Sequence, residues 1–273
     1  MSDPQEPDGL RVESDDTPIA IRDAPDVREV VRLADPLGDD LREHAAEAGT
    51  LHLAAVAVAA EFVVPPILRL YRGRYPHTEI KVAVGNRAKT LQRLLYGEAD
   101  LAIGGRPPES AGISGEPFLR NGFVVVAAPD HPLAGAGWLD AGVLSDQTWL
   151  LREHRSGDRR VTEDFWNRSG IHPSSVITLG SNGVAREAAA VGLGLALVSA
   201  YSVASDLHHG RLVQLPVPAT PVEGSWYALT LSRGHPFATA QDLLALLRGP
   251  ELRAAIEAAF GPAVRFLPRS PTA

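Results

Sequence analysis

The sequence predicts an α/β fold with a mostly parallel sheet. From Gly49 onward, short apolar segments of strand length alternate with segments of helical periodicity, which is the pattern of parallel α/β proteins. One of the strands shows a two-residue period, because Ile80, Val82 and Val84 alternate with other side chains. Helical segments stop at glycines such as Gly170, which suit the left-handed residue that ends many helices.

In the first half of this region, each helix has a local signal. Pro65 and Pro66 suit the first turn of a helix, where a backbone N–H donor is not needed. Asn86 is placed to cap the next helix, and Gly97 to end it. We expect helices at about residues 65–74 and 86–97, and strands at residues 51–58, 79–84, 100–103 and 122–128.

The second half repeats the alternation. Either Ser181 or Asn182 can cap a helix that runs to Val191 and stops at Gly192. A later Pro-rich turn separates the last two strands. We expect strands at residues 148–151, 176–179, 193–199, 211–215 and 225–231, and helices at residues 158–169, about 182–191 and within 238–260.

The two ends of the chain have a different character. Residues 1–25 are rich in acidic residues, Pro and Ser without periodicity, which predicts a disordered acidic segment. Residues 26–48 are predicted to form linker-type helices, in which Val27 and Val30 begin a narrow apolar stripe. Either a partner helix or the chain's own body can cover that stripe. Residues 263–273 are predicted to form a loose tail.

Composition limits the classes of function. The 273 residues include 26 basic and 33 acidic side chains, a formal net charge of −7 that argues against a protein coating nucleic acid. The absence of cysteine excludes disulfides, thiolate metal sites and cysteine nucleophiles. No secretory signal and no apolar run of about 20 residues is visible. We therefore expect a cytoplasmic protein without a membrane partner.

Motifs of common enzyme classes are missing from the sequence. It contains no Gly-x-Ser-x-Gly elbow, no phosphate-binding Gly-x-x-x-x-Gly-Lys loop and no His-Glu-x-x-His zinc motif. His208 and His209 precede Gly210 at an expected helix end, and we interpret them as a cap or a solvated pair rather than a metal site. We expect no catalytic residues, no metal and no cofactor.

Six segments, considered together and in their order along the chain, resemble one known family. They are GTLHLAAVAVAAEFVVPPILRLYRGRYP, VGNRAKTLQRLLYGEADLAIGGRPP, FVVVAAPDHPLAG, LLREHRSGDRR, LGSNGVAREAAAVGLGLALVS and GRLVQLPV. No single segment is specific. Together, over about residues 26–250, they resemble the effector-binding domain of LysR-type transcriptional regulators.

This resemblance implies the fold of type 2 periplasmic binding proteins. In that fold two Rossmann-like lobes are joined by two crossover strands, and the effector binds between the lobes. The resemblance also implies a homodimer or a higher homo-oligomer, with an organic acid or a phosphorylated metabolite as effector. The effector-binding domain would span residues 49–262, with lobe I at 50–128 and 225–262, lobe II at 129–224, and crossings near Ala128 and Ser225.

LysR-type regulators normally carry a winged helix-turn-helix before the linker helix. The 25 residues that precede the linker-type segment are too few and too acidic for that domain. Pro36 also interrupts a helix that the family usually keeps continuous. We therefore do not expect residues 1–273 to bind duplex DNA specifically.

The candidate effector site lies where strands end and helices begin, since free N–H groups and the positive end of a helix attract oxyanions. The loop at Ser156, the helix entry at Ser181 and the turn at Gly105 have this character, and the resemblance places them together. The predicted effector-binding residues are Val56, Ala57, Val58, Gly105, Arg106, Arg155, Ser156, Asp158, Ser181 and Asn182.

Two positions depart from the family pattern. Residues 56–58 are apolar where the family usually has hydroxyl side chains, and Asp158 stands where it usually has Thr. Asp158 either faces an amine or hydroxyl of the effector or serves as a carboxylate in the first helical turn. Three neighbouring arginines, Arg152, Arg155 and Arg159, favour an anionic ligand.

The predicted function is therefore effector sensing within a LysR-type regulator. A cytoplasmic solute-binding or scavenging protein of the same fold is the alternative. Both hypotheses place a small molecule between the two lobes.

Overall fold

Strand pairing in the computed structural model forms one large mixed sheet and one small parallel sheet. The structure describes residues 49–109, 112–233 and 236–260, and all of them belong to one compact unit. The expected N-terminal segment, linker-type helices and C-terminal tail lie outside the described residues. The strand order in the large sheet is β2-β1-β3-β9-β4-β7, with β8 paired to β4, and the small sheet pairs β5 with β6.

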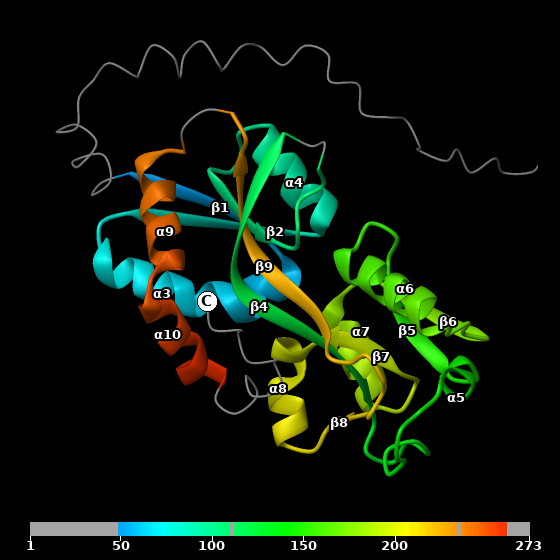
Figure 1. Ribbon diagram of the computed structural model, residues 1–273. Coiled ribbons are helices and arrows are strands. Elements are labelled where there is room, and N and C mark those ends of the chain that lie inside the picture. The colour runs from blue at the N-terminus through cyan, green and yellow to red at the C-terminus, as the bar shows by residue number, and fades with distance from the viewer. Residues whose placement is uncertain (1–48, 110–111, 234–235, 261–273) are drawn as a thin grey trace, which may run out of the picture. The chain divides into compact units, whose positions relative to one another are not determined.

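The alternation of strands and helices that the sequence predicts is present along the chain (Figure 1). Strands β1, β2 and β3 pair in parallel, as do β5 and β6, whereas β9 and β4 run antiparallel to their neighbours. The elements are β1 (Thr50–Val56), η1 (Ala59–Val63), α3 (Val64–Arg74), β2 (Glu79–Gly85), α4 (Arg87–Leu95), β3 (Leu101–Gly104), β4 (Ile113–Ala127), α5 (Ala141–Ser145), β5 (Thr148–Arg152), α6 (Gly157–Ser169), β6 (Ser175–Leu179), α7 (Asn182–Ala190), β7 (Ala196–Ser199), α8 (Ala200–His208), β8 (Val213–Gln214), β9 (Val222–Leu231), α9 (Ala238–Arg248) and α10 (Pro250–Phe260).

Two long strands connect the lobes. Strand β4 pairs with β9 from Ile113 to Phe123, and from Phe123 to Val126 it also pairs with β7. Figure 1 shows β4 and β9 running side by side between the elements β1–β3 and the elements β5–β7. We call β1–β3, α3, α4, α9 and α10 lobe I, and β5–β8 with α5–α8 lobe II. We propose that the boundary lies within β4 rather than at Ala128.

Alternation along β4 divides its side chains between two apolar clusters. Phe123, Val125 and Ala127 pack with Trp149 and the other buried residues of lobe II. The residues between them, on the opposite face, join a larger cluster that extends from the helices of lobe I to α7 and α8. Successive side chains of a strand point to opposite faces, so this one strand contributes to both cores.

The first strand is shorter than predicted. It ends at Val56, and Ala57 and Val58 already lie in a helical turn that leads into the π-helix η1. The backbone N–H of Val64 donates to the carbonyl of Ala59, five residues earlier. Pro65 and Pro66 follow Val64 and have no N–H to donate. The N–H of Val64 is therefore the last donor before the prolines, and it closes the wider turn of the π-helix.

Other boundaries also differ from the prediction. Strand β4 begins at Ile113 rather than Gly122, because β9 pairs with it from Ile113 to Phe123. Strand β7 begins at Ala196 rather than Leu193, and β8 is reduced to Val213–Gln214. Gly194 explains the late start of β7: it has a φ of 157°, and a Cβ there would lie 2.3 Å from the carbonyl oxygen of Thr148. Only glycine fits this approach.

Candidate functional site

Contacts across the carboxyl ends of the strands bring part of the predicted site together. A Cβ built on Gly104, at the end of β3, would lie 3.5 Å from Val56 at the end of β1. A Cβ on Gly105 would lie 3.8 Å from Arg87 Nη1, and one on Gly157 would lie 3.8 Å from Arg87 Cδ. The ends of β1 and β3 and the starts of α4 and α6 therefore meet here.

The Ser156 loop enters α6 as a capped helix start. Ser156 is buried, and its Oγ accepts a hydrogen bond of 3.3 Å from the backbone N–H of Asp158. A Ser at this position satisfies one of the free donors of the first turn. Arg155 is exposed in the same loop, as is Arg106 after β3.

The start of α7 resolves the choice between two capping residues. Ser181 is the cap, since its Oγ accepts a 3.1 Å hydrogen bond from the N–H of Val184. Asn182 is the first helical residue, is buried, and donates from its side chain to the carboxylate of Asp158. This hydrogen bond joins the first turns of α6 and α7.

Asp158 is therefore a first-turn carboxylate rather than a cap. Burial raises its pKa above the ordinary value, although the positive charge of Arg152 and the hydrogen bond from Asn182 act in the opposite direction. The negative charge of Glu153 adds to the increase. The carboxylate is thus partly satisfied by the protein itself.

Two of the three arginines near Ser156 are already paired. Buried Arg152 donates to Glu153 at 2.8 and 3.1 Å and to the carbonyl of Gly180 at 3.5 Å. Arg159 donates to Glu163 at 2.7 Å and to the Arg152 carbonyl at 3.1 Å. Of the three arginines that the sequence places near Ser156, these two are therefore held by protein groups and position the loop.

Arg87 also lies here, although it is not among the residues predicted from the sequence. It is the first residue of α4, and Asn86 caps that helix as predicted, with a 3.0 Å hydrogen bond from the N–H of Lys89. Burial, and after it the positive charge of Arg160, lower the pKa of Arg87 below the ordinary value. The one sequence signal that could have indicated Arg87 is its position directly after Asn86, the predicted cap of the helix.

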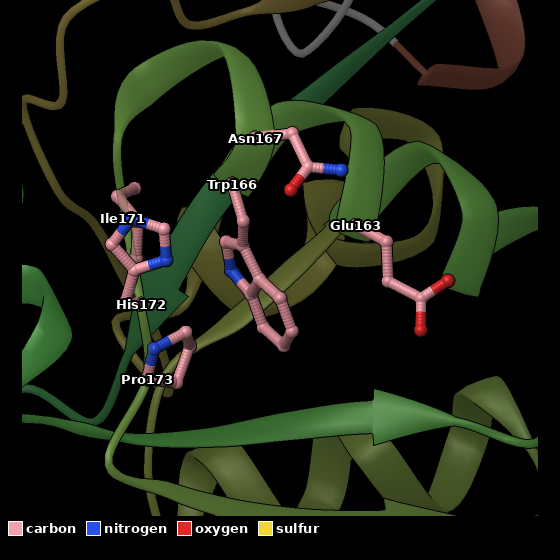
Figure 2. A pocket seen from close by; sticks show the side chains of 6 residues that line it. All are labelled: Glu163, Trp166, Asn167, Ile171, His172 and Pro173. Carbon is pink, nitrogen blue, oxygen red and sulfur yellow. The ribbon is translucent and has the colours of Figure 1, made fainter.

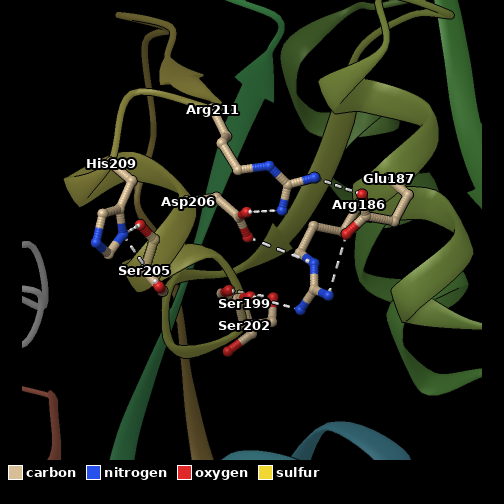
Figure 3. A network of polar contacts seen from close by, with 8 residues as sticks. All are labelled: Arg186, Glu187, Ser199, Ser202, Ser205, Asp206, His209 and Arg211. Carbon is tan, nitrogen blue, oxygen red and sulfur yellow. Dashed lines mark hydrogen bonds and ion pairs between the residues drawn. The ribbon is translucent and has the colours of Figure 1, made fainter.

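An ion-pair network fixes α7 to α8 beside this site (Figure 3). Asp206, buried on α8, pairs with Arg211 at 2.7 Å and with Arg186 at 3.4 Å. Glu187 pairs with the same two arginines. Arg186 lies one turn after Asn182, so the network holds the helix that begins at the candidate site.

Two cavities lie in lobe II, and none of the ten predicted residues lines either of them. The smaller has a volume of about 260 Å³ and is bordered by α5 and the turn at Pro218. The larger, of about 520 Å³, lies beside the second half of α6 (Figure 2). Its lining residues are Glu163, Trp166, Asn167, Ile171, His172 and Pro173.

Two other expectations concern metals and membranes. Within residues 49–109, 112–233 and 236–260, no cluster of three or more His, Asp or Glu side chains is arranged to hold a metal ion. His209 is the C-cap residue of α8, and its Nδ1 lies 2.8 Å from the carbonyl oxygen of Ser205. None of the described helices is both long enough and apolar enough to cross a membrane.

Comparison with known proteins decides the family. Residues 44–249 match the family described as the LysR substrate binding domain. The chain belongs to this family. The transcriptional regulator CfxR of Cupriavidus necator is 36% identical over 187 residues, which make up 68% of this chain and 58% of CfxR. The transcriptional activator CmpR of Synechocystis is 32% identical over 181 residues, which make up 66% of this chain and 59% of CmpR.

Solved structures agree with the fold. The regulatory domain of CcmR from Synechocystis, solved with 2-PG, is 30% identical with a TM-score of 0.69, and the match covers 73% of this chain and 96% of that domain. The effector-binding domain of QuiR, solved with shikimate, has a TM-score of 0.66 at 18% identity over 76% of this chain and 97% of that domain, which shows the fold alone. The LysR effector-domain architecture predicted from the sequence is confirmed.

Proposed function

We propose that this chain is the effector-sensing part of a LysR-type transcriptional regulator. Family membership supports this function, because the relatives named above are regulators. We also propose that it acts in the cytoplasm, where such regulators reach their target genes, and that it catalyses no reaction. The segment that matches this chain makes up 58% of CfxR. What CfxR does as a whole protein, including any binding of DNA, therefore involves residues outside the matched segment.

We propose that the effector binds where the two lobes meet. One observation carries this proposal: Arg87 of lobe I lies next to Gly157 of lobe II beside the strand ends, where a Cβ built on Gly157 would be 3.8 Å from Arg87 Cδ. A ligand at this junction touches both lobes and can change their relative positions. The proposed contacts are the ten residues predicted from the sequence, from Val56 to Asn182, with a small organic acid or a phosphorylated metabolite as the ligand class.

A thermal-shift screen followed by calorimetric titration tests this site. The screen should include 2-phosphoglycolate, shikimate and inorganic phosphate. For any compound that binds, Ser156→Ala and Asn182→Ala should weaken affinity by roughly tenfold or more, because a hydrogen bond to a charged ligand contributes roughly 1.5 to 3 kcal/mol.

Asp140→Ala is the matched control for the loss of a helix cap. Asp140 caps α5 through a 2.9 Å hydrogen bond from the N–H of Val143, and none of the proposed effector contacts lies on that helix. The control variant should lose about 1 kcal/mol of stability and keep full affinity. Equal affinity of wild type, Ser156→Ala and Asn182→Ala for a confirmed ligand would rule out this site.

We propose further that the chain forms a homodimer through its edge strands. Within the part of the chain that the structure describes, β2 ends the large sheet and β6 ends the small one, so each has a hydrogen-bonding edge that no other described strand covers. Val82 and Val84 on β2 and Val176 on β6 are exposed although they are apolar. Edge strands with exposed valines favour association with a second copy of the chain.

A further inference from the structure

Arg87 is a cation that reaches from lobe I to lobe II without an opposite charge at its tip. Its side chain leaves the first turn of α4, and Nη1 lies 3.8 Å from where a Gly105 Cβ would be. Its Cδ and Cβ pack at 3.8 and 3.9 Å from the corresponding position of Gly157. Among the described residues, Arg87 has no carboxylate partner and no hydrogen bond.

The charge that does act on Arg87 is another arginine. Arg160 lies three residues after Gly157, on the same face of α6, and its positive charge adds to burial in lowering the pKa of Arg87. Arg160 is largely exposed, and its ion pair with Asp164 is long, at 3.9 Å. Two like charges from the two lobes therefore face a common region.

The nearby carboxylates are engaged elsewhere. Glu153 binds Arg152, and Glu163 binds Arg159. Asp158 accepts from Asn182 and does not contribute to the pKa of Arg87. Arg160 keeps its long ion pair with Asp164, so among the described residues Arg87 is the one of the two facing arginines without a carboxylate partner. Neutralisation of Arg87 therefore requires an anion from outside this set of residues.

We propose that Arg87 and Arg160 bind a phosphate group between the two lobes, and that Arg87 is the main determinant of specificity for phosphorylated small molecules. This inference rests on the proposed function and adds to the ten predicted residues. A guanidinium binds two phosphate oxygens as a fork, and the remaining oxygens are free for the second arginine. Gly105 has no side chain to place against the tip of Arg87, and a Cβ there would lie 3.8 Å from Nη1.

The test is calorimetric titration of the 273-residue chain with 2-phosphoglycolate and with inorganic phosphate. Arg87→Gln should weaken binding of both by about ten- to a hundredfold, the loss expected for a charge-assisted contact. Arg160→Gln should weaken it only a few-fold, because exposed charges contribute less. Lys89→Gln is the matched control, since it removes one positive charge from an exposed position on the same helix and should change affinity less than twofold.

A second measurement separates ligand binding from a structural role. Without ligand, Arg87→Gln should melt at the same temperature as wild type or higher, because it removes one of two repelling charges. Phosphate should raise the melting temperature of wild type but not of Arg87→Gln. A structural Arg87 would give the opposite result: a lower melting temperature without ligand and an unchanged response to phosphate.

The outcomes distinguish this inference from the proposed function. If the wild-type chain binds neither phosphate compound, or if Arg87→Gln binds them as tightly as wild type, the inference is overturned. If shikimate or another unphosphorylated compound still binds and is lost in Ser156→Ala, the proposed effector site survives that failure. If no compound responds to any of these substitutions, both are wrong.

Discussion

Asp158 shows how opposing local effects set the charge of one side chain. The first turn of a helix normally favours a carboxylate, because the free N–H groups there carry partial positive charge. Here burial has the larger effect and raises the pKa of Asp158, despite the attraction of Arg152 and the hydrogen bond from Asn182. The ionised form is therefore less compatible with the folded state than with the unfolded chain.

The substitution Asp158→Asn should stabilise the protein at neutral pH. A group whose pKa is raised on folding contributes stability only while it is protonated, and that contribution is lost as the pH rises through the folded pKa. The difference in urea midpoint between variant and wild type should thus be largest at about pH 7 and shrink as the pH falls. Asp164→Asn, an exposed change on the same helix, should follow wild type at each pH. Lower stability of Asp158→Asn than of wild type at neutral pH would contradict the raised pKa of this carboxyl.

Some site residues could be predicted from the sequence because their signals are local. Asn86 and Ser181 each cap a helix by accepting a hydrogen bond from the backbone N–H three residues later. Gly170 ends α6 in the left-handed conformation with a φ of 68°. The position of Arg87 depends on α6, which is distant in sequence. No local sequence pattern specifies such a long-range approach. An arginine that faces another lobe cannot be distinguished in the sequence from an arginine that faces only solvent.

At the scale of elements, close backbone approach at Gly194 joins the small sheet to β7. The N–H of Leu195 donates to the carbonyl of Thr148 at 2.8 Å, and the N–H of Leu150 donates to the carbonyl of Leu195 at 2.8 Å. These bonds require the approach that a side chain on Gly194 would block. The predicted strand from residue 193 was too long because this tertiary contact, rather than β propensity, sets its start.

Gly194→Ala should destabilise the fold by about 1 to 3 kcal/mol, the usual cost of forcing atoms into a packed region. Urea unfolding followed by circular dichroism measures the change. Gly73→Ala is the control, because Gly73 lies exposed in α3 with nothing within 4 Å of an added Cβ. That helical change should stabilise by roughly 0.5 to 1 kcal/mol. Similar stabilities for the two variants would show that the Gly194 contact is not restrictive.

At the scale of the whole molecule, the alternating pattern of the sequence was sufficient for the fold class but not for sheet order. Each strand of lobe I has its own apolar signal, yet β9 lies between β3 and β4 although it comes after all of lobe II. The order follows from pairing between distant segments, such as Ile103 with Ala228. The family resemblance supplied this long-range information, and periodicity alone did not.

The proposed dimer predicts a concentration-dependent mass. Light scattering at tens of micromolar should give about twice the monomer mass of 29.1 kDa. Val84→Lys places a charge on the open edge of β2 and should shift the protein toward the monomer. Val143→Lys, an exposed change on α5, should leave the mass unchanged. A wild-type monomer at these concentrations would refute association through the edge strands.

The place of β9 in the large sheet has a consequence for biosynthesis. As the chain leaves the ribosome, β3 and β4 emerge well before residues 222–231, so the gap between them stays open while lobe II is translated. Lobe II can close its own sheet and helices during that interval, whereas lobe I waits for its central strand. Nascent chains that stall before β9 therefore expose two strand edges at once, and such edges recruit chaperones or aggregate.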